Sequence, residues 1–135
     1  MAFWLIKAEP SAYGWDRLVK EKGTVWDGVR NYQARNNLQA MKKGDLCLFY
    51  HSVKDKEIVG VARVTREAYP DPTTEDRRWA AVDIVPQHPL ERPVSLATLK
   101  STPATSGMAL IRQGRLSVCP VTSREYMAVL KLGGS

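Results

Sequence analysis

The sequence predicts one small α+β domain, in which short strands form a partly closed barrel and short helices pack around it. The run Leu46–Tyr50 is apolar at every position, which is typical of a strand that is buried on both faces. Residues 58–69 follow a polar turn and have the pattern of the second arm of a hairpin. Short strand-like and helix-like segments alternate along the rest of the chain, which favours a mixed domain over a helical bundle. The 135 residues, 44% of them hydrophobic, suit a single domain over residues 1–135 with one core.

The first third of the chain is predicted to hold one strand and two helices. The apolar run Phe3–Ala8 predicts the strand. Ser11 is a candidate cap for a short helix that has Trp15 on its apolar face and ends at Gly23. A second helix is predicted to begin at Asn31, because asparagine is among the preferred N-terminal caps.

The remaining two thirds are predicted to be rich in strands. Beyond the first strand, further strands are expected over residues 45–52, 58–69, 79–87 and 115–121. Ser95 is a candidate cap for a short helix between the last two strands. Thr122 and Glu125 have the spacing of a capping box, which predicts a final helix after residue 122.

The charge of the chain indicates an anionic partner. The net charge is +6 and the sequence pI is about 9.5. Nucleic acid is the commonest partner of a compact basic domain, although a basic surface can also serve only for solubility. Composition alone leaves both interpretations open.

The cysteines and the N-terminus bear on the cellular location. Cys47 and Cys119 each lie in an apolar run without the spacing of a zinc site, so we expect buried thiols, no metal and a reducing compartment. The apolar run near the N-terminus is too short for a signal peptide or a membrane span. We therefore expect a soluble protein of the cytoplasm, or of the nucleus if the source is eukaryotic, that does not bind membranes.

Residues arranged for catalysis are not evident. His51 and His88 are the only histidines, and the sequence contains no motif for a serine nucleophile, a phosphate loop or a dinucleotide. His51 and Ser52 are neighbours on a predicted strand, so their side chains are expected on opposite faces. We therefore expect a protein that is not an enzyme and needs no cofactor.

Aromatic residues beside polar and basic ones are the more informative feature. The stretch Val25–Asp45 brings Trp26, Arg30, Asn31 and Tyr32 close together in sequence. A base pulled out of its stack needs flat apolar walls and a few hydrogen-bonding groups for its edge. Each residue also has a purely structural interpretation, because an asparagine can serve simply as a helix cap and a tryptophan simply as part of the core.

The four tryptophans and the basic residues differ in what their positions favour. Trp4 and Trp15 lie on apolar faces, which favours the core. For two tryptophans the sequence does not decide between the core and a pocket. Trp26 lies beside a turn, and Trp79 follows two arginines. Arg35 can belong to a pocket or to a solvated helix face.

Five segments give the chain a clear family resemblance. It is similar to the EVE-domain family over residues 3 to about 130, in the segments FWLIKAEPSAY, WDGVRNYQARNNL, KGDLCLFYHS, IVGVARV and RQGRLSVCPVTSREY. The resemblance implies a PUA-like pseudo-barrel of about five to six strands with short helices packed around it. That fold is related to the YTH domain, which holds a methylated base in an aromatic cage. A non-catalytic module that recognises a modified base in DNA or RNA is the function that the resemblance implies.

The resemblance also implies which residues form the site. A base pocket would be lined by Trp26, Val29, Arg30, Asn31, Tyr50, His51 and Ser52, with Lys7 and Glu9 at its rim. Trp79, which lies outside the quoted segments, is a further candidate wall. Phosphate contacts would come from Arg35, Arg112 and Arg115.

Two other functions remain open at this point. One is an enzyme of nucleic-acid or nucleotide metabolism that uses Glu9 and His51 as acid and base. The other is a protein-interaction module.

Overall fold

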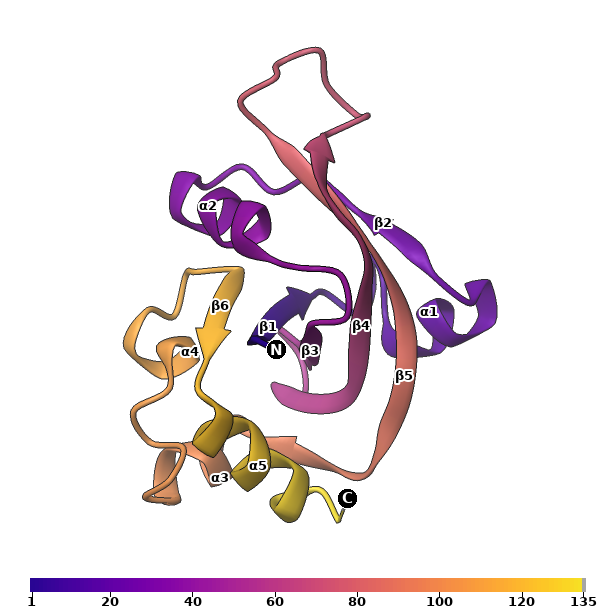
Figure 1. The fold of residues 1–135 in the computed structure, drawn as a ribbon. Helices are drawn as coiled ribbons and strands as arrows, with labels where there is room; N and C mark the ends of the chain where they lie inside the picture. The colour runs from indigo at the N-terminus through magenta and orange to yellow at the C-terminus, as the bar shows by residue number, and fades with distance from the viewer. Residues whose placement is uncertain (135) are drawn as a thin grey trace.

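The computed structural model describes residues 1–134, which form one curved mixed sheet with short helices around it (Figure 1). The strands are β1 (Phe3–Ala8), β2 (Thr24–Trp26), β3 (Leu46–His51), β4 (Glu57–Pro70), β5 (Ala80–Ser95) and β6 (Val118–Val121). The helices are α1 (Trp15–Glu21), α2 (Tyr32–Ala40), α3 (Leu96–Ser101), α4 (Ala109–Arg112) and α5 (Ser123–Leu132).

The sheet is strongly curved but it is not closed. Its strand order is β2-β5-β4-β3-β1-β6, so β2 and β6 are the two edges. β1 and β3 are parallel, and the other neighbours are antiparallel. The register between β4 and β5 shifts at four places, and such irregularities bend and twist long strands. The predicted α+β class is therefore confirmed, as a six-stranded pseudo-barrel whose edges stay open.

Most of the predicted helix starts are confirmed by hydrogen bonds. The Asn31 side chain accepts from the backbone N–H of Ala34 at 2.9 Å, and Ser95 caps α3 in the same way. The capping box between Thr122 and Glu125 is present at the start of α5. The prediction for Ser11 is wrong, because α1 begins after Gly14 without a side-chain cap.

The predicted end of the β5 strand at residue 87 is also wrong. The strand continues to Ser95, through Pro86 and Pro89, although proline cannot donate a ladder hydrogen bond. β2 pairs with β5 only at Val82–Ile84, so beyond Ile84 one edge of β5 has no strand beside it. Prolines are tolerated on such an edge, which explains why they do not end the strand here. The three-residue β2 and the one-turn α4 escaped prediction because both are very short.

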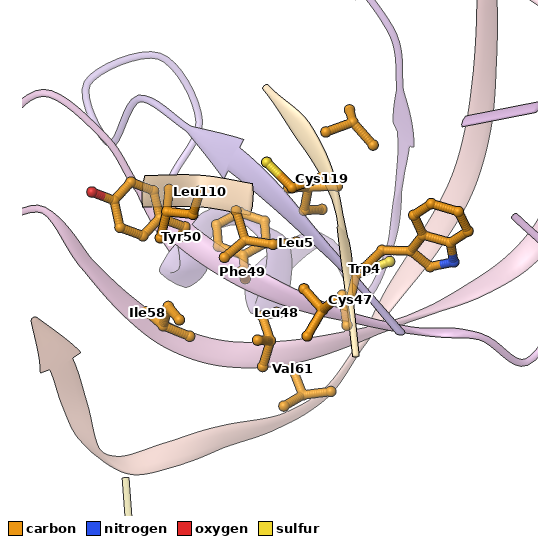
Figure 2. Close-up of a cluster of buried hydrophobic side chains, with 14 of the residues drawn as sticks. Trp4, Leu5, Cys47, Leu48, Phe49, Tyr50, Ile58, Val61, Leu110 and Cys119 are labelled. Atoms are coloured by element: carbon orange, nitrogen blue, oxygen red, sulfur yellow. The ribbon is translucent and has the colours of Figure 1, made fainter. Parts of the chain in front are cut away.

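The buried core includes two of the tryptophans, Trp4 and Trp15. Figure 2 shows the part of it around Trp4 and strand β3. Trp4 and Trp15 are each only 7% exposed, which confirms their predicted place in the core. The Trp4 indole N–H donates to the Asp45 carboxylate at 3.0 Å, so its polar atom is satisfied. Both cysteines are buried and free, and burial raises the pKa of Cys119 to about 11. A thiol with such a raised pKa is a poor nucleophile at neutral pH.

No helix in the described part of the chain is long and apolar enough to cross a membrane.

Candidate functional site

A hollow of about 220 Å³ opens at the carboxyl end of β1, between the turn that follows this strand and the edge strand β2. We call it the Trp26 hollow. It is lined by Lys7, Ala8, Glu9, Ala12, Tyr13, Thr24, Val25, Trp26 and Asp27.

Two local structures bring these walls together. In the turn after β1, the backbone N–H groups of Ala12 and Tyr13 both donate to the carbonyl of Glu9, at 2.9 and 2.8 Å. On the opposite wall, β2 is held to the sheet by its pairing with β5, where Trp26 lies opposite Val82. The hollow therefore has one wall from a hydrogen-bonded turn and one from a strand edge.

Two aromatic rings form the apolar part of the hollow. Tyr13 meets the Trp26 ring edge-on at a centroid distance of 6.0 Å, and Trp26 meets the fully buried Phe49 edge-on at 5.6 Å. The Tyr13 hydroxyl donates to Glu21 at 2.8 Å, and the Arg17 guanidinium lies 4.8 Å from the centre of the Tyr13 ring. Both half-buried rings are thus held in place before any ligand arrives.

One ammonium and two carboxylates supply the polar part of the hollow. Lys7 donates to the carbonyl of Gly114 at 2.8 Å, and burial lowers the pKa of the Lys7 ammonium. Burial, with a smaller contribution from the nearby negative charge of Asp71, raises the pKa of Asp27. Glu9 accepts a hydrogen bond from the Ser11 hydroxyl at 3.0 Å. No ion pair within residues 1–134 involves Lys7, Glu9 or Asp27, so all three can still bind a ligand.

Asp71 fixes the turn that follows Trp26. Its buried carboxylate accepts from the backbone N–H of Gly28 and from the Arg30 guanidinium, both at 2.9 Å. Burial opposes ionisation of Asp71, but hydrogen bonds from Thr73 and Arg30 outweigh that effect and hold its pKa well below the usual range. Gly28 has a φ of 75°, which a glycine adopts without strain. The loop between β4 and β5 therefore positions a wall of the Trp26 hollow, from more than 40 residues away in sequence.

A second aromatic group lies at the start of α2, against the loop between β4 and β5. Tyr32 and Trp79 stack with their centroids 5.1 Å apart and an interplanar angle of 27°. Three arginines cover these rings, at 5.1 to 5.9 Å from a ring centre: Arg30, Arg35 and Arg78. We call these five residues the aromatic stack.

The polar groups of the aromatic stack are mostly paired with each other. Arg78 forms an ion pair with Asp76 at 2.6 Å and donates to the Tyr32 hydroxyl at 2.9 Å. Arg35 donates to the backbone carbonyl of Arg78 at 3.1 Å. Trp79, predicted as a pocket wall, belongs to this group and does not line the Trp26 hollow.

The predicted site residues are divided by the structure. Trp26, Lys7 and Glu9 line the Trp26 hollow together. The other predicted pocket residues lie outside it: Val29, Arg30, Asn31, Tyr50, His51, Ser52 and Trp79.

Several of these outlying residues have evident structural contacts. Tyr50 is only 3% exposed and belongs to the buried cluster of Figure 2. The His51 Nε2 accepts from the backbone N–H of Trp15 at 3.1 Å, and the Ser52 hydroxyl donates to the carbonyl of Ala8 at 3.2 Å. Burial lowers the pKa of His51, in keeping with a neutral ring that accepts this hydrogen bond.

The predicted phosphate contacts lie in two different settings. Arg35 is half-buried in the aromatic stack. Arg112 and Arg115 are exposed, around the turn that follows α4. Arg112 donates to the carbonyl of Gly107 at 2.8 Å, which leaves the rest of its guanidinium open to solvent.

Sequence reasoning missed Tyr13 and Asp71. Tyr13 stands in a polar segment, and an aromatic residue outside any apolar period is the sequence signal that could have identified it. Asp71 stands between two prolines and resembles an ordinary turn residue, and only its long-range hydrogen bonds show its role.

The chain resembles known proteins over almost its whole length. Human thymocyte nuclear protein 1 is 37% identical to it, in an alignment that covers 96% of this chain and 72% of the human protein. The solved structure of Rpa0253 from Rhodopseudomonas palustris has a TM-score of 0.94 and 47% identity, and covers 99% of this chain and 94% of its own. Human THYN1, solved in complex with DNA containing 5-methylcytosine, has a TM-score of 0.91 and 34% identity, and covers 100% of this chain and 99% of its own.

The family assignment agrees with these similarities and with the fold. The EVE domain matches residues 2–132, which include every strand and helix described above. The chain belongs to the EVE domain family.

Proposed function

We propose that this protein is a non-catalytic binding module that takes a modified base of DNA into the Trp26 hollow. The observation that carries the proposal is the meeting of two fixed aromatic rings with an ammonium and two carboxylates that have no ion-pair partner within residues 1–134. A base needs such flat walls and edge-binding groups once it leaves its stack. The related human THYN1 was solved with DNA that contains 5-methylcytosine, which makes this base the first candidate.

The groups in the hollow match the edge of a cytosine. Aspartate and glutamate accept hydrogen bonds from the exocyclic amine of cytosine, so Asp27 or Glu9 can bind that amine. Lys7 has donors beyond the one given to Gly114, and these suit the acceptors of the same ring. Ala8, Ala12 and Val25 offer apolar surface for a methyl group.

The proposal assigns no acid or base chemistry to Glu9 and His51. The two residues do not line the hollow together, since His51 lies outside it. The acceptor nitrogen of the His51 ring is already used by the backbone N–H of Trp15. A general base must have a free acceptor within reach of the proton that it removes.

Binding to matched duplexes tests the proposal. We expect the protein to bind a duplex with one 5-methylcytosine more tightly than the same duplex with cytosine, and to leave the DNA chemically unchanged. Asp27→Asn should reduce the affinity for the methylated duplex, because an amide puts a donor where the carboxylate offers only acceptors.

The matched control removes the same charge elsewhere. Asp16 is exposed in the first turn of α1 and lies outside the hollow, so Asp16→Asn should leave the affinity unchanged. Equal affinity for both duplexes, or equal losses in the two variants, would contradict the proposal. Consumption of the modified base would point to an enzyme.

A further inference from the structure

A second hollow is linked to the Trp26 hollow by one hydrogen bond and has a different chemistry. It has a volume of about 260 Å³ and is lined by Asn31, Gln33, Gln113, Gly114, Arg115 and Leu116. We call it the amide hollow. Lys7 lines the Trp26 hollow and donates to the carbonyl of Gly114, which lines the amide hollow, at 2.8 Å. One hydrogen bond therefore joins a residue of the first hollow to a residue of the second.

The polar side chains of the amide hollow are largely unused. The side chains of Gln33, Gln113 and Arg115 make no hydrogen bond to other groups of residues 1–134, and Arg115 has no carboxylate within ion-pair distance there. Asn31 uses its oxygen to cap α2, which leaves its amide N–H groups available. Unused donors and acceptors thus gather around a hollow beside the proposed base pocket.

This donor and acceptor set suits the edges of a base better than a phosphate. A phosphate presents only acceptors, so it would use the amide N–H groups of the glutamines and leave their carbonyl oxygens without a donor. A base edge presents donors and acceptors side by side. Arginine pairs best with the O6 and N7 acceptors of guanine, and a glutamine oxygen can accept from the N–H groups on the other edge of the same base.

We infer that the amide hollow binds a guanine close to the modified base, with Arg115 and Gln113 as the residues that select it. The inference rests on the proposed function, because it places this guanine beside a base held in the Trp26 hollow. The guanine is either the neighbour of the modified base in its own strand or the base left unpaired opposite it. The protein then recognises a modified base together with its context.

The test measures binding to duplexes that carry one 5-methylcytosine and differ only in the neighbouring or the opposite base. We expect the loss of one particular guanine to weaken binding about fivefold to a hundredfold. Replacing the neighbouring base removes the first possible guanine, and an abasic site opposite the modified base removes the second. The change that weakens binding therefore identifies which guanine is bound.

Two arginine variants test the residue assignment. Arg115→Ala should abolish the guanine preference, whereas Arg112→Ala removes the same charge from an exposed side chain outside the hollow and should preserve it. Gln113→Ala should reduce the preference without a change in net charge. Thermal unfolding of each variant confirms that it is folded.

The outcomes separate this inference from the proposed function. A protein that prefers 5-methylcytosine over cytosine in every context, without a guanine preference, overturns the inference and leaves the proposed function intact. A preference for adenine, or an Arg115→Ala variant that weakens binding equally in all contexts, also overturns it. Absence of any preference for the methylated base contradicts the proposed function itself.

Discussion

The Trp26 hollow and the aromatic stack look alike in sequence and differ in what their polar groups do. Both combine two aromatic rings with basic side chains. In the aromatic stack the arginines lie over the rings and pair with Asp71, Asp76 and backbone carbonyls. Both regions border open space, because Trp79 also lines a hollow of about 310 Å³, but in the Trp26 hollow Lys7, Glu9 and Asp27 have no ion-pair partner in residues 1–134.

This difference shows how a binding surface can be told from a scaffold of similar composition. Groups that satisfy one another stabilise the fold, whereas groups left unpaired around a cavity remain available for a ligand. The proposed function therefore places base binding in the Trp26 hollow, whereas the aromatic stack holds the start of α2 against the loop between β4 and β5.

The largest expected effect is on the carboxylate that joins the two regions. Asp71→Ala removes the buried partner of Arg30 and the acceptor of the Gly28 N–H. We expect the free energy of unfolding to fall by about 3 kcal/mol, which is the lower end of the cost of breaking a buried ion pair. The lower end applies because Arg30 is partly exposed to water. Asp71→Asn keeps an acceptor and should lose less. Chemical denaturation measures both, and a loss below that of an ordinary surface substitution would show that the turn does not depend on Asp71.

The next effect separates the two tryptophans. Trp26→Ala should weaken binding of the methylated duplex by about 1–3 kcal/mol, the usual contribution of one base–aromatic stack. Its stability should fall by less than the roughly 3–5 kcal/mol of a fully buried aromatic truncation, since the ring is only half-buried.

Trp79→Ala is the matched control for this comparison. It should reduce stability by about 1 kcal/mol for the lost stack on Tyr32 and by a further amount for the lost burial of the ring, and it should leave affinity unchanged. If Trp79→Ala weakened binding more than Trp26→Ala, the roles that we assign to the two regions would be reversed.

A smaller effect is expected at the helix cap between the two regions. Asn31→Ala should cost about 1 kcal/mol of stability, because the N–H of Ala34 loses its acceptor. Asn31→Ser keeps a capping oxygen and should restore most of that loss. Chemical denaturation of the unchanged protein and of both variants measures these differences. Equal stability of the three proteins would mean that the cap contributes nothing.

The smallest effect is a dependence of stability on pH. Burial lowers the pKa of His51 below 6.5, so the unfolded chain takes up a proton at a higher pH than the folded protein does. Stability should therefore be complete above about pH 6.5 and decline as the pH falls from there towards the lower pKa of the folded state. His51→Gln should lack this part of the decline. An identical pH profile in both proteins between pH 7.5 and 5 would contradict the role of the Trp15–His51 hydrogen bond.

Local features of the fold could be predicted from the sequence. The residues that line the Trp26 hollow could be predicted only in part. The strand Phe3–Ala8 and the caps at Asn31, Ser95 and Thr122 depend on neighbouring residues, and the structure confirms them. The long β5 depends on its partner strands, which sequence periodicity does not reveal.

The site illustrates the same limit. The resemblance to the EVE domain grouped Trp26, Lys7 and Glu9, and the structure places all three around the Trp26 hollow. It also grouped Tyr50 and His51 with them, because they follow one another along a strand, yet the fold buries Tyr50 and turns His51 to the start of α1. Asp71 acts across 43 positions of sequence, so only the folded chain shows its contact with Gly28.

The most direct test of the central claim is a nuclear magnetic resonance titration that follows the four tryptophan indole N–H signals. Each signal is assigned with a single Trp→Phe variant, and a duplex with one 5-methylcytosine is added. The Trp26 signal should shift strongly, whereas those of Trp4, Trp15 and Trp79 should change little, since these three lie in the core or in the aromatic stack. A strong shift of Trp79 with an unchanged Trp26 would contradict the central claim.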